Sequence, residues 1–381
     1  MMTLQSKKEL LEVIHPRYLK ASKARKTQIL DEFAAATGYH RKYAISVLKR
    51  GPRPRGLRKR VGRKKIYQGE VIKVLAQIWE ILGRICSKRL KPFLPEIVGV
   101  LERCNEIQMM QETKKLLLQM SCSTIDRRLR PVRFENKKRG LSTTKPGTLL
   151  KSAIPIRTFT DWDETIPGFV EVDLVAHCGE TTAGQYLNTL TVTDIATGWT
   201  ECLAILYRSQ QMVSQAIIEL RQRLPFPLLG IDSDNGSEFI NSTLFRYCQD
   251  EKITFTRCRP YKKNDQAHVE QKNWSVVRRL IGYDRHETEE ELALLRVIYD
   301  DWRLYVNFFQ PVLKLVAKKR IGSKVKKKYD TAATPFRRVL ASDLVSTDNK
   351  ARLINLYYQL NPVTLRKQID DNIAKLWKLV R

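Results

Sequence analysis

Three consecutive segments in the middle of the chain alternate between apolar and polar residues, and this feature most constrains the fold. They are GFVEVDLVA (168–176), YLNTLTVTDI (186–195) and WTECLAIL (199–206). A period of two predicts β-strands that bury one face, and the turn at Thr197-Gly198 favours pairing of the last two. The three segments together predict a β-meander.

Helix and strand patterns then alternate as far as residue 281. Helices are predicted at 209–223, 239–250 and 266–281, and short buried strands at 227–232 (PLLGID) and 253–256. A meander followed by alternating helices and strands indicates a mixed α/β sheet with helices on its faces. We expect this core to cover residues 159–310.

The first third of the chain has helical periodicity. Arg25–Arg50 divides at Gly38 into two runs that each have one apolar face, which predicts a helix-turn-helix domain in residues 1–50. The second helix would present four polar side chains to a DNA groove, namely Arg41, Lys42, Ser46 and Lys49. The alternative is an ordinary helical hairpin that packs on its neighbours.

Strong positive charge points to a polyanionic partner. Lysine and arginine number 69 against 40 acidic residues, a formal net charge of +29. Nucleic acid is the favoured partner and an anionic membrane surface the rival, although no apolar run reaches the roughly 18 residues of a membrane span. The basic linker 51–67 would contact DNA through Arg53, Arg55, Arg58, Lys59, Arg60, Arg63, Lys64 and Lys65.

Further helices are predicted on both sides of the sheet region. Residues 68–132 are expected to form a second helix-turn-helix-like domain, with a recognition helix over 116–130 that is capped by Ser121 or Ser123 and carries Arg127 and Arg128. A linker is predicted at 133–158. The C-terminal region 311–381 is expected to be helical and basic. It includes 312–328, with eight basic residues and no acidic one, and a closing helix that starts near Asn361-Pro362.

Three carboxylates lie at the ends of predicted elements. Asp173 comes late in the first strand, on the face opposite Val172 and Leu174. Asp234 ends a later strand before the turn at Asn235-Gly236, and Glu270 lies on the long helix. Such carboxylates can converge on hard divalent cations, and two such ions can hold the attacking and leaving oxygens of a phosphoryl displacement.

The ordered set Asp173, Asp234-Asn235-Gly236 and Glu270 resembles the Asp-Asp-Glu catalytic core of retroviral integrases and bacterial insertion-sequence transposases. The surrounding GFVEVDLVAHCG, TDIATGWTE, DSDNGSEFIN, RPYKKNDQAHVEQKNW and YVNFFQP strengthen the likeness, which covers almost the whole chain. The resemblance implies a ribonuclease H-like fold. It also implies two Mg²⁺ or Mn²⁺ ions per active site, bound by the three carboxylates. One departure from retroviral integrases is the missing His/Cys zinc module at the N-terminus.

The expected function is that of a DNA transposase that binds terminal inverted repeats, cleaves 3′ ends and transfers strands to target DNA. The resemblance implies a homo-oligomer, at least a dimer, and we expect a cytoplasmic, nucleoid-associated protein. Lys272 and Asn273 are expected to contact phosphates. Two alternatives stay open: a catalytically inactive, transposase-derived DNA-binding protein, and a metal-dependent nuclease that cuts without joining.

Several neighbouring residues have a structural interpretation beside a functional one. Glu171 and Asp232 could support the ligands, but exposed or ion-paired carboxylates are favoured. For His177 and His268, hydrogen bonding or DNA contact is favoured over metal ligation. Asp194 and Asp265 are expected to be structural, and Trp199, Trp274 and Trp302 to belong to the core. The seven scattered cysteines lack C-x-x-C spacing and are expected to be reduced.

Overall fold

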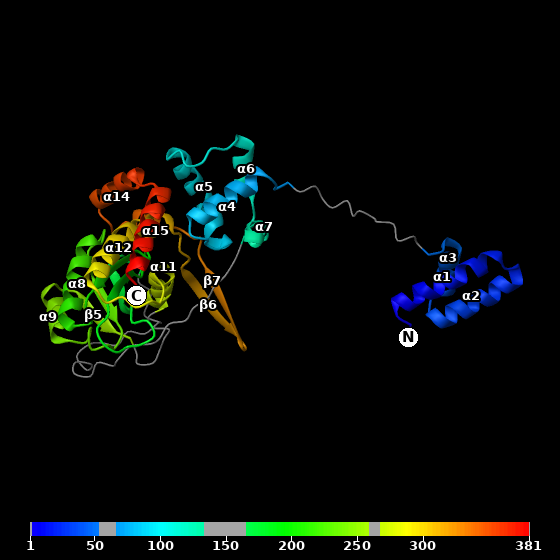
Figure 1. Ribbon diagram of the computed structural model, residues 1–381, viewed down its shortest axis with the longest axis horizontal. Coiled ribbons are helices and arrows are strands. Elements are labelled where there is room, and N and C mark those ends of the chain that lie inside the picture. Colours follow the sequence, from blue (N-terminus) through cyan, green and yellow to red (C-terminus); the bar gives the residue numbers. More distant parts are fainter. Residues whose placement is uncertain (1, 53–65, 133–164, 259–266, 381) are drawn as a thin grey trace. The chain divides into compact units, whose positions relative to one another are not determined.

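The computed structural model describes residues 2–52, 66–132, 165–258 and 267–380. The chain divides into two compact units, Met1–Ile66 and Tyr67–Arg381 (Figure 1). The described part of the first unit has helices as its only regular elements, and the second unit contains the five-stranded sheet. The larger unit also carries the three carboxylates singled out in the sequence.

The N-terminal unit is a three-helix arrangement of α1 (Leu4–Lys20), α2 (Lys23–Thr37) and α3 (Arg41–Arg50). Phe33, Ala44 and Leu48 are fully buried where the helices meet. Gly38 ends α2 in the left-handed conformation (φ 69°), and its N–H donates to the Ala34 carbonyl, an arrangement that favours glycine. The division into two helices at Gly38 is as predicted, whereas DNA binding by this unit stays a prediction.

A five-stranded mixed sheet forms the centre of the larger unit, as predicted. Its strands are β1 (Phe169–Ala176), β2 (Asn188–Asp194), β3 (Thr200–Ile205), β4 (Gly230–Ser233) and β5 (Thr254–Arg257). They lie in the order β3-β2-β1-β4-β5. The meander β1-β2-β3 is antiparallel, whereas β4 runs parallel to both β1 and β5.

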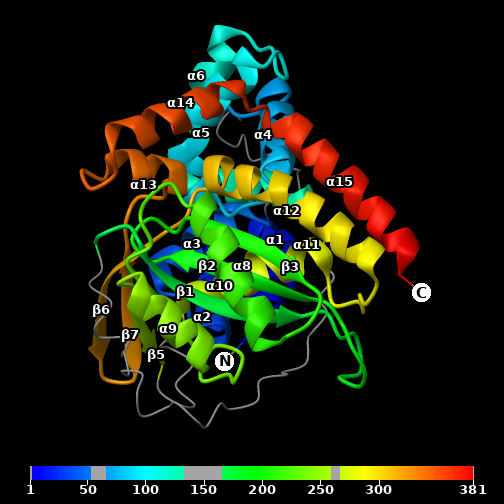
Figure 2. The same cartoon turned by 90° about the vertical axis from the view of Figure 1, so that its left-hand side faces the viewer.

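Helices cover both faces of the sheet (Figure 2). On one face, Val170 and Val172 pack in a core with α8 (Gln210–Arg223) and α9 (Ser242–Asp250). The other face packs against α10 (Ala267–Lys272), a π-helical segment (Asn273–Arg278), α11 (Arg279–Ile281) and α12 (Glu289–Phe309). The predicted helix 266–281 is therefore present, with a π-helical stretch in its middle.

The helices before and after the sheet share one continuous apolar core. They are α4 (Glu70–Ile81), α5 (Ser87–Arg103), α6 (Gln111–Gln119), α7 (Cys122–Leu129), α13 (Pro335–Ala341), α14 (Thr347–Gln359) and α15 (Pro362–Leu379). Residues 68–132, set apart as a domain in the sequence, thus pack together with α12–α15. The predicted recognition helix 116–130 is broken at Met120, and Ser121 caps α7 by accepting the Thr124 N–H at 3.2 Å.

The prediction that the basic segment 312–328 is helical is wrong. It forms an antiparallel two-stranded ribbon of β6 (Leu315–Ile321) and β7 (Lys324–Tyr329), here called the basic ribbon, which is almost fully exposed. Gly322, in the left-handed region (φ 59°), and Ser323 make the two-residue turn that joins the strands. In a helix the same lysines would crowd together one turn apart and repel one another.

Other expectations from sequence can be compared directly. Asn361 caps the closing helix by accepting the Val363 N–H at 2.9 Å, with Pro362 in its first turn, as predicted. The seven cysteines are free thiols, and four of them are buried. Within the described ranges, none of the helices combines the length and apolar character that crossing a bilayer requires.

Candidate active site

Asp173 and Asp234 occupy adjacent positions on two parallel strands. The last paired residues of β1 and β4 are Val172 and Ser233, and each aspartate follows directly. Because side chains alternate along a strand, Asp173 lies on the sheet face opposite Val172, toward α10. Parallel pairing thus converts two aspartates that are far apart in sequence into neighbours at the point where the pairing of β1 with β4 ends.

Hydrogen bonds on both sides of Glu270 fasten its helix to β1. Before it, the Glu171 carboxylate accepts the backbone N–H of Val269 at 2.7 Å through Oε2. After it, Asn273 Nδ2 donates to Asp173 Oδ2 at 2.6 Å. Both anchors lie on the strand that carries Asp173, so Glu270 is held close to that strand. Glu270 itself is exposed.

Burial, and for Asp173 also the charges of neighbouring carboxylates, shifts the protonation of the two aspartates. Burial, followed by the charge of Asp234 and with a contribution from Glu270, raises the pKa of Asp173 to about 8, against the effect of hydrogen bonds from Leu174 N–H and Asn273. Burial also raises the pKa of Asp234, while the Gly236 N–H and Arg208 oppose the rise. Asp173 therefore responds to the charges of both other members of the predicted set.

This donor set fits a hard divalent cation in its chemistry. All three groups offer carboxylate oxygens, the ligands that Mg²⁺ and Mn²⁺ prefer. A cation between them would offset the repulsion that adds to burial in raising the pKa of Asp173. Their side chains do not, however, form a closed ligand shell. Across the described ranges no group of three or more His, Cys, Asp or Glu side chains is arranged to hold a metal ion.

The turn after Asp234 orients this carboxylate and ties it to β5. Asp234 Oδ1 accepts the Gly236 N–H at 2.8 Å, which closes an Asx-type turn. Asn235 Nδ2 donates to the Cys258 carbonyl at 2.8 Å, and Arg257 donates to Asn235 Oδ1 at 3.1 Å. The Asn-Gly sequence thus turns the chain and also fixes the site to the neighbouring strand.

Two carboxylates favoured as exposed or ion-paired are in fact buried, so the prediction that they are exposed was wrong. Glu171 binds the start of α10, and burial raises its pKa well above the usual range. Asp232 accepts the Thr256 hydroxyl at 2.5 Å. The available signal was their spacing, because each stands two residues before a proposed ligand and so shares its strand face.

The histidines and tryptophans divide between core and surface. His177 is fully buried and hydrogen-bonds the Thr189 hydroxyl at 2.7 Å, in line with the hydrogen-bonding role. Burial lowers the pKa of His268 to about 4, helped by Lys314 and Lys272. Trp199 and Trp302 are buried as predicted. Trp274 is 60% exposed, so its assignment to the core was wrong.

Lys272, Asn273 and Asp194 are anchored inside the protein. Lys272 is buried and donates to the Gly198 carbonyl at 3.2 Å, and burial lowers its pKa to about 7. Asn273 binds Asp173, so phosphate contact by either residue stays a prediction. Asp194 is structural as expected, since it accepts the Thr197 N–H at 2.7 Å in the turn before β3. Asp265 lies outside the described residues.

The predicted DNA-contact residues of the helical regions are mostly at the surface. On α3, Arg41, Lys42 and Lys49 are exposed, although Arg41 pairs with Asp31. Ser46 is half-buried and accepts a hydrogen bond from Arg50 at 3.0 Å. On α7, Arg127 is exposed and Arg128 half-buried. The predicted contacts of the linker lie outside the described residues: Arg53, Arg55, Arg58, Lys59, Arg60, Arg63, Lys64 and Lys65.

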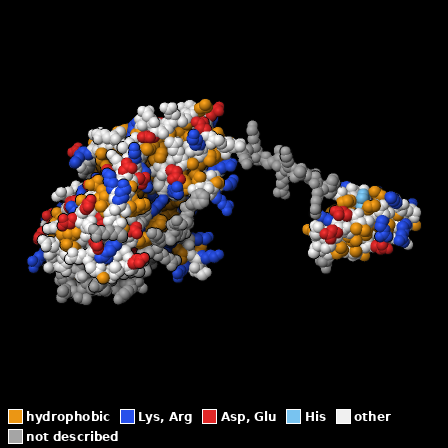
Figure 3. All heavy atoms as spheres, in the orientation of Figure 1, with side chains coloured by type: hydrophobic (Ala, Val, Ile, Leu, Met, Phe, Trp, Pro, Cys, Tyr) orange, Lys and Arg blue, Asp and Glu red, His pale blue; other side chains and the backbone are white. Residues whose placement is uncertain are grey.

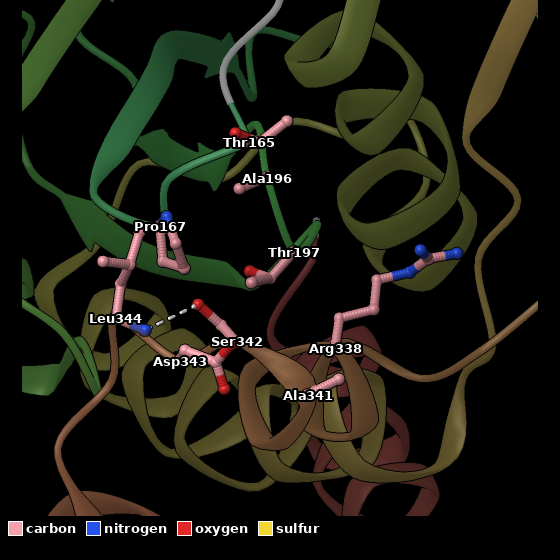
Figure 4. A pocket seen from close by; sticks show the side chains of 9 residues that line it. All are labelled: Thr165, Pro167, Ala196, Thr197, Arg338, Ala341, Ser342, Asp343 and Leu344. Atoms are coloured by element: carbon pink, nitrogen blue, oxygen red, sulfur yellow. Dashed lines mark hydrogen bonds between the residues drawn. The ribbon is translucent and has the colours of Figure 1, made fainter.

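Two hollows lie near the sheet. The larger, here called the basic cavity, has a volume of about 1170 Å³ and is bounded by the loop before α5, the α10–α11 region, α15 and the basic ribbon. The smaller, about 380 Å³, lies where α13 meets the turn at Ala196-Thr197 and includes none of the three carboxylates (Figure 4). Its Arg338 pairs with Asp330 at 2.7 Å.

Comparison with known proteins identifies one close relative. The chain is 42% identical over 342 residues to the "Uncharacterized protein y4rM" of Sinorhizobium fredii (strain NBRC 101917 / NGR234), a match that covers 88% of this chain and 95% of that protein. The chain belongs to the same family as this protein. No protein-family model matches the sequence.

Among solved structures, the catalytic core domain of BIV integrase is similar at a TM-score of 0.32 with 19% identity. The match covers 46% of this chain and 95% of that one. A likeness this low carries no information on activity.

Proposed function

We propose that this chain is a DNA transposase that cleaves DNA at the 3′ ends of a mobile element and joins these ends to target DNA. The observation that carries the proposal is the placement of Asp173 and Asp234 at adjacent ends of the parallel pair β1–β4. Glu270 comes from the helix fastened to the same strand. The order and spacing of these residues in the sequence, with their flanking motifs, support the same function.

Each residue of the site has a proposed role. Asp173, Asp234 and Glu270 would hold the divalent ions, Asn273 would orient Asp173, and Glu171 would position Glu270 by fixing the start of α10. When bound, Mg²⁺ or Mn²⁺ offsets the charge that gathers on the phosphate oxygens and lowers the pKa of a bound water. The raised pKa of Asp173 means that the carboxyl must lose a proton before it can serve as a ligand.

Positive charge supports DNA as the substrate. The net charge of +29 provides a general attraction to phosphates. In the described part of the larger unit, Lys and Arg side chains gather on the basic ribbon (Figure 3). A phosphodiester substrate also suits a site of hard oxygen ligands.

The test is strand transfer by the full chain with an oligonucleotide that carries the element's own end, located from paired inverted repeats around the gene. Joining should require Mg²⁺ or Mn²⁺ and should be lost in Asp234→Asn. Asp250→Asn is the matched control, because this exposed aspartate ends α9 and undergoes the same change of charge. Undiminished joining by Asp234→Asn would refute the site assignment, and hydrolysis without joining would favour a nuclease.

A further inference from the structure

The basic cavity has an unusual wall, in which one buried, two half-buried and one exposed cation are held by uncharged groups. Arg89 donates to the Pro311 carbonyl at 2.5 Å, Lys272 to the Gly198 carbonyl at 3.2 Å, and Lys314 to the Ala196 carbonyl at 2.5 Å. Arg279 donates to the Gly83 carbonyl. Backbone carbonyls fix these side chains in place without neutralising them, and Lys314 is additionally attracted by the charges of Asp194 and Asp330.

The acidic residues of the cavity do not neutralise this wall. The two carboxylates that line it, Glu80 and Asp370, each pair with an arginine one helical turn away, at 2.9 Å and 2.7 Å. Burial lowers the pKa of Arg89, and repulsion from the charge of Arg279 adds to this effect. A bound polyanion would relieve this repulsion.

The basic ribbon completes the cavity on one side. Lys318 and Lys327 stand directly opposite each other on β6 and β7, and both line the cavity. The next cross-strand pair, Lys319 and Lys326, points to the other face because side chains alternate, and does not line it. Like charges directly opposite each other destabilise an isolated ribbon, so an anionic partner would stabilise this element too.

Aromatic rings are exposed on the same surface. Trp377 of α15 is 60% exposed and Tyr329 of β7 is 47% exposed, and both line the cavity. Cation-lined grooves with accessible aromatic rings are how proteins bind single strands, because phosphates follow the charges and unpaired bases stack on the rings. The volume of about 1170 Å³ also exceeds the roughly 300–1,000 Å³ of an ordinary small-ligand pocket.

We propose that the basic cavity binds a single-stranded segment of DNA, with its phosphates along the cation wall and its bases against Trp377 and Tyr329. Gln271 and Lys272, the residues that follow Glu270, line the cavity, so the bound strand passes within one helical turn of Glu270. A paired duplex cannot stack its bases on these rings, which selects for unpaired ends. This inference deepens the transposase function and rests on it, although binding itself needs no catalysis.

The test measures binding of a fluorescent 12-nucleotide oligo(dT), and of a 12-base-pair duplex, to the full chain in EDTA. The variant Lys318→Gln/Lys327→Gln should bind the single strand at least about fivefold more weakly, and its salt slope should fall by about 1.4, or ~0.7 per phosphate contact. Lys319→Gln/Lys326→Gln removes the same charge from the same ribbon and should stay within about twofold of the wild type.

A second pair of variants tests stacking. Trp377→Ala should weaken oligo(dT) binding at least about fivefold, because a base loses its stacking partner. Tyr358→Ala, an aromatic residue of α14 that is 63% exposed but does not line the cavity, should have little effect. All four side chains of the ribbon variants are exposed, so unchanged thermal midpoints are expected.

Equal weakening by the two ribbon variants, or equal loss of duplex and single-strand binding, would overturn the inference in favour of general charge attraction. The outcome is separable from that of the proposed reaction. Cavity-specific binding without any Mg²⁺-dependent joining would remove the transposase function and leave the cavity as a single-strand site. Normal joining without cavity-specific binding would remove only the cavity inference.

Discussion

Glu171 Oε2 accepts the backbone N–H of Val269 at 2.7 Å and so joins the strand of Asp173 to the first turn of the helix of Glu270. The acceptor is fully buried, and among the residues that the structure describes its second oxygen, Oε1, has no hydrogen-bond partner. A buried carboxyl at a helix N-terminus both satisfies a free N–H and interacts favourably with the helix dipole. We infer that this contact sets the position of Glu270.

Removal of the Glu171 side chain should free the start of α10 from β1 and so make the position of Glu270 less fixed. Glu171→Ala should lower the free energy of unfolding by about 1–3 kcal/mol, the cost of leaving the buried Val269 N–H without its acceptor, and should reduce strand transfer. Glu171→Gln should retain most of both properties, because its side-chain amide oxygen can accept the same Val269 N–H. Urea denaturation with Glu180→Ala, an exposed glutamate, as control checks this. Equal stability of the Ala variant would contradict the positioning role.

The pKa of Asp173 predicts a pH dependence for the metal-free protein. Its folded-state pKa of about 8 lies above the ordinary aspartate value of 3.8, so the folded state holds the proton more tightly. The stability that this group contributes is fully present below about pH 4 and is lost as pH rises to about 8. Asp173→Asn should flatten this part of the curve of unfolding free energy against pH. A curve identical to that of the wild type would refute the raised pKa.

Mg²⁺ should counteract the loss of stability that accompanies deprotonation of Asp173 as the pH rises. Since metal ligands must be deprotonated, the increase in melting temperature on adding Mg²⁺ should be larger at pH 8 than at pH 6. The same increase should be absent in Asp234→Asn and retained in Asp250→Asn. A Mg²⁺ effect that is independent of pH, or that survives in Asp234→Asn, would place the metal elsewhere. Differential scanning fluorimetry with and without EDTA is sufficient.

The sequence predicts most of the sheet because its signals there are local. The alternation of apolar and polar residues predicts β1, β2 and β3. Once β4 is paired in parallel with β1, Asp173 and Asp234 must lie close together. The depth of burial of Glu171 and Asp232 depends on helices that approach from distant parts of the chain, which no local pattern records. The basic ribbon was mistaken for a helix because its charge run has no clear period and only Gly322-Ser323 marks the turn.

A buried ion pair should dominate the stability of the sheet edge. Arg303 of α12 binds Glu201 of β3 through two contacts, Nε to Oε2 at 2.6 Å and a terminal nitrogen to Oε1 at 2.9 Å, while Trp199 Nε1 donates to Oε1 at 2.7 Å. Glu201→Gln leaves Arg303 without its charged partner and should cost about 3–5 kcal/mol. Glu251→Gln, which breaks an exposed pair with Arg221, should cost less than about 1 kcal/mol. Similar urea midpoints for the two variants would contradict this ranking.

The N-terminal unit offers a test of end recognition that does not depend on the active site. Lys42 and Lys49 are exposed on α3, the helix predicted to enter a DNA groove. If each contacts one phosphate, Lys42→Ala/Lys49→Ala in the full chain should reduce the slope of log affinity against log salt by about 1.8, or ~0.9 per contact.

The control variant, Lys8→Ala/Lys20→Ala on α1, removes the same charge from exposed positions of the same unit. Fluorescence anisotropy with duplex DNA from the element end should show the loss only for the α3 variant. An equal loss for both variants would indicate attraction by net charge rather than by this helix.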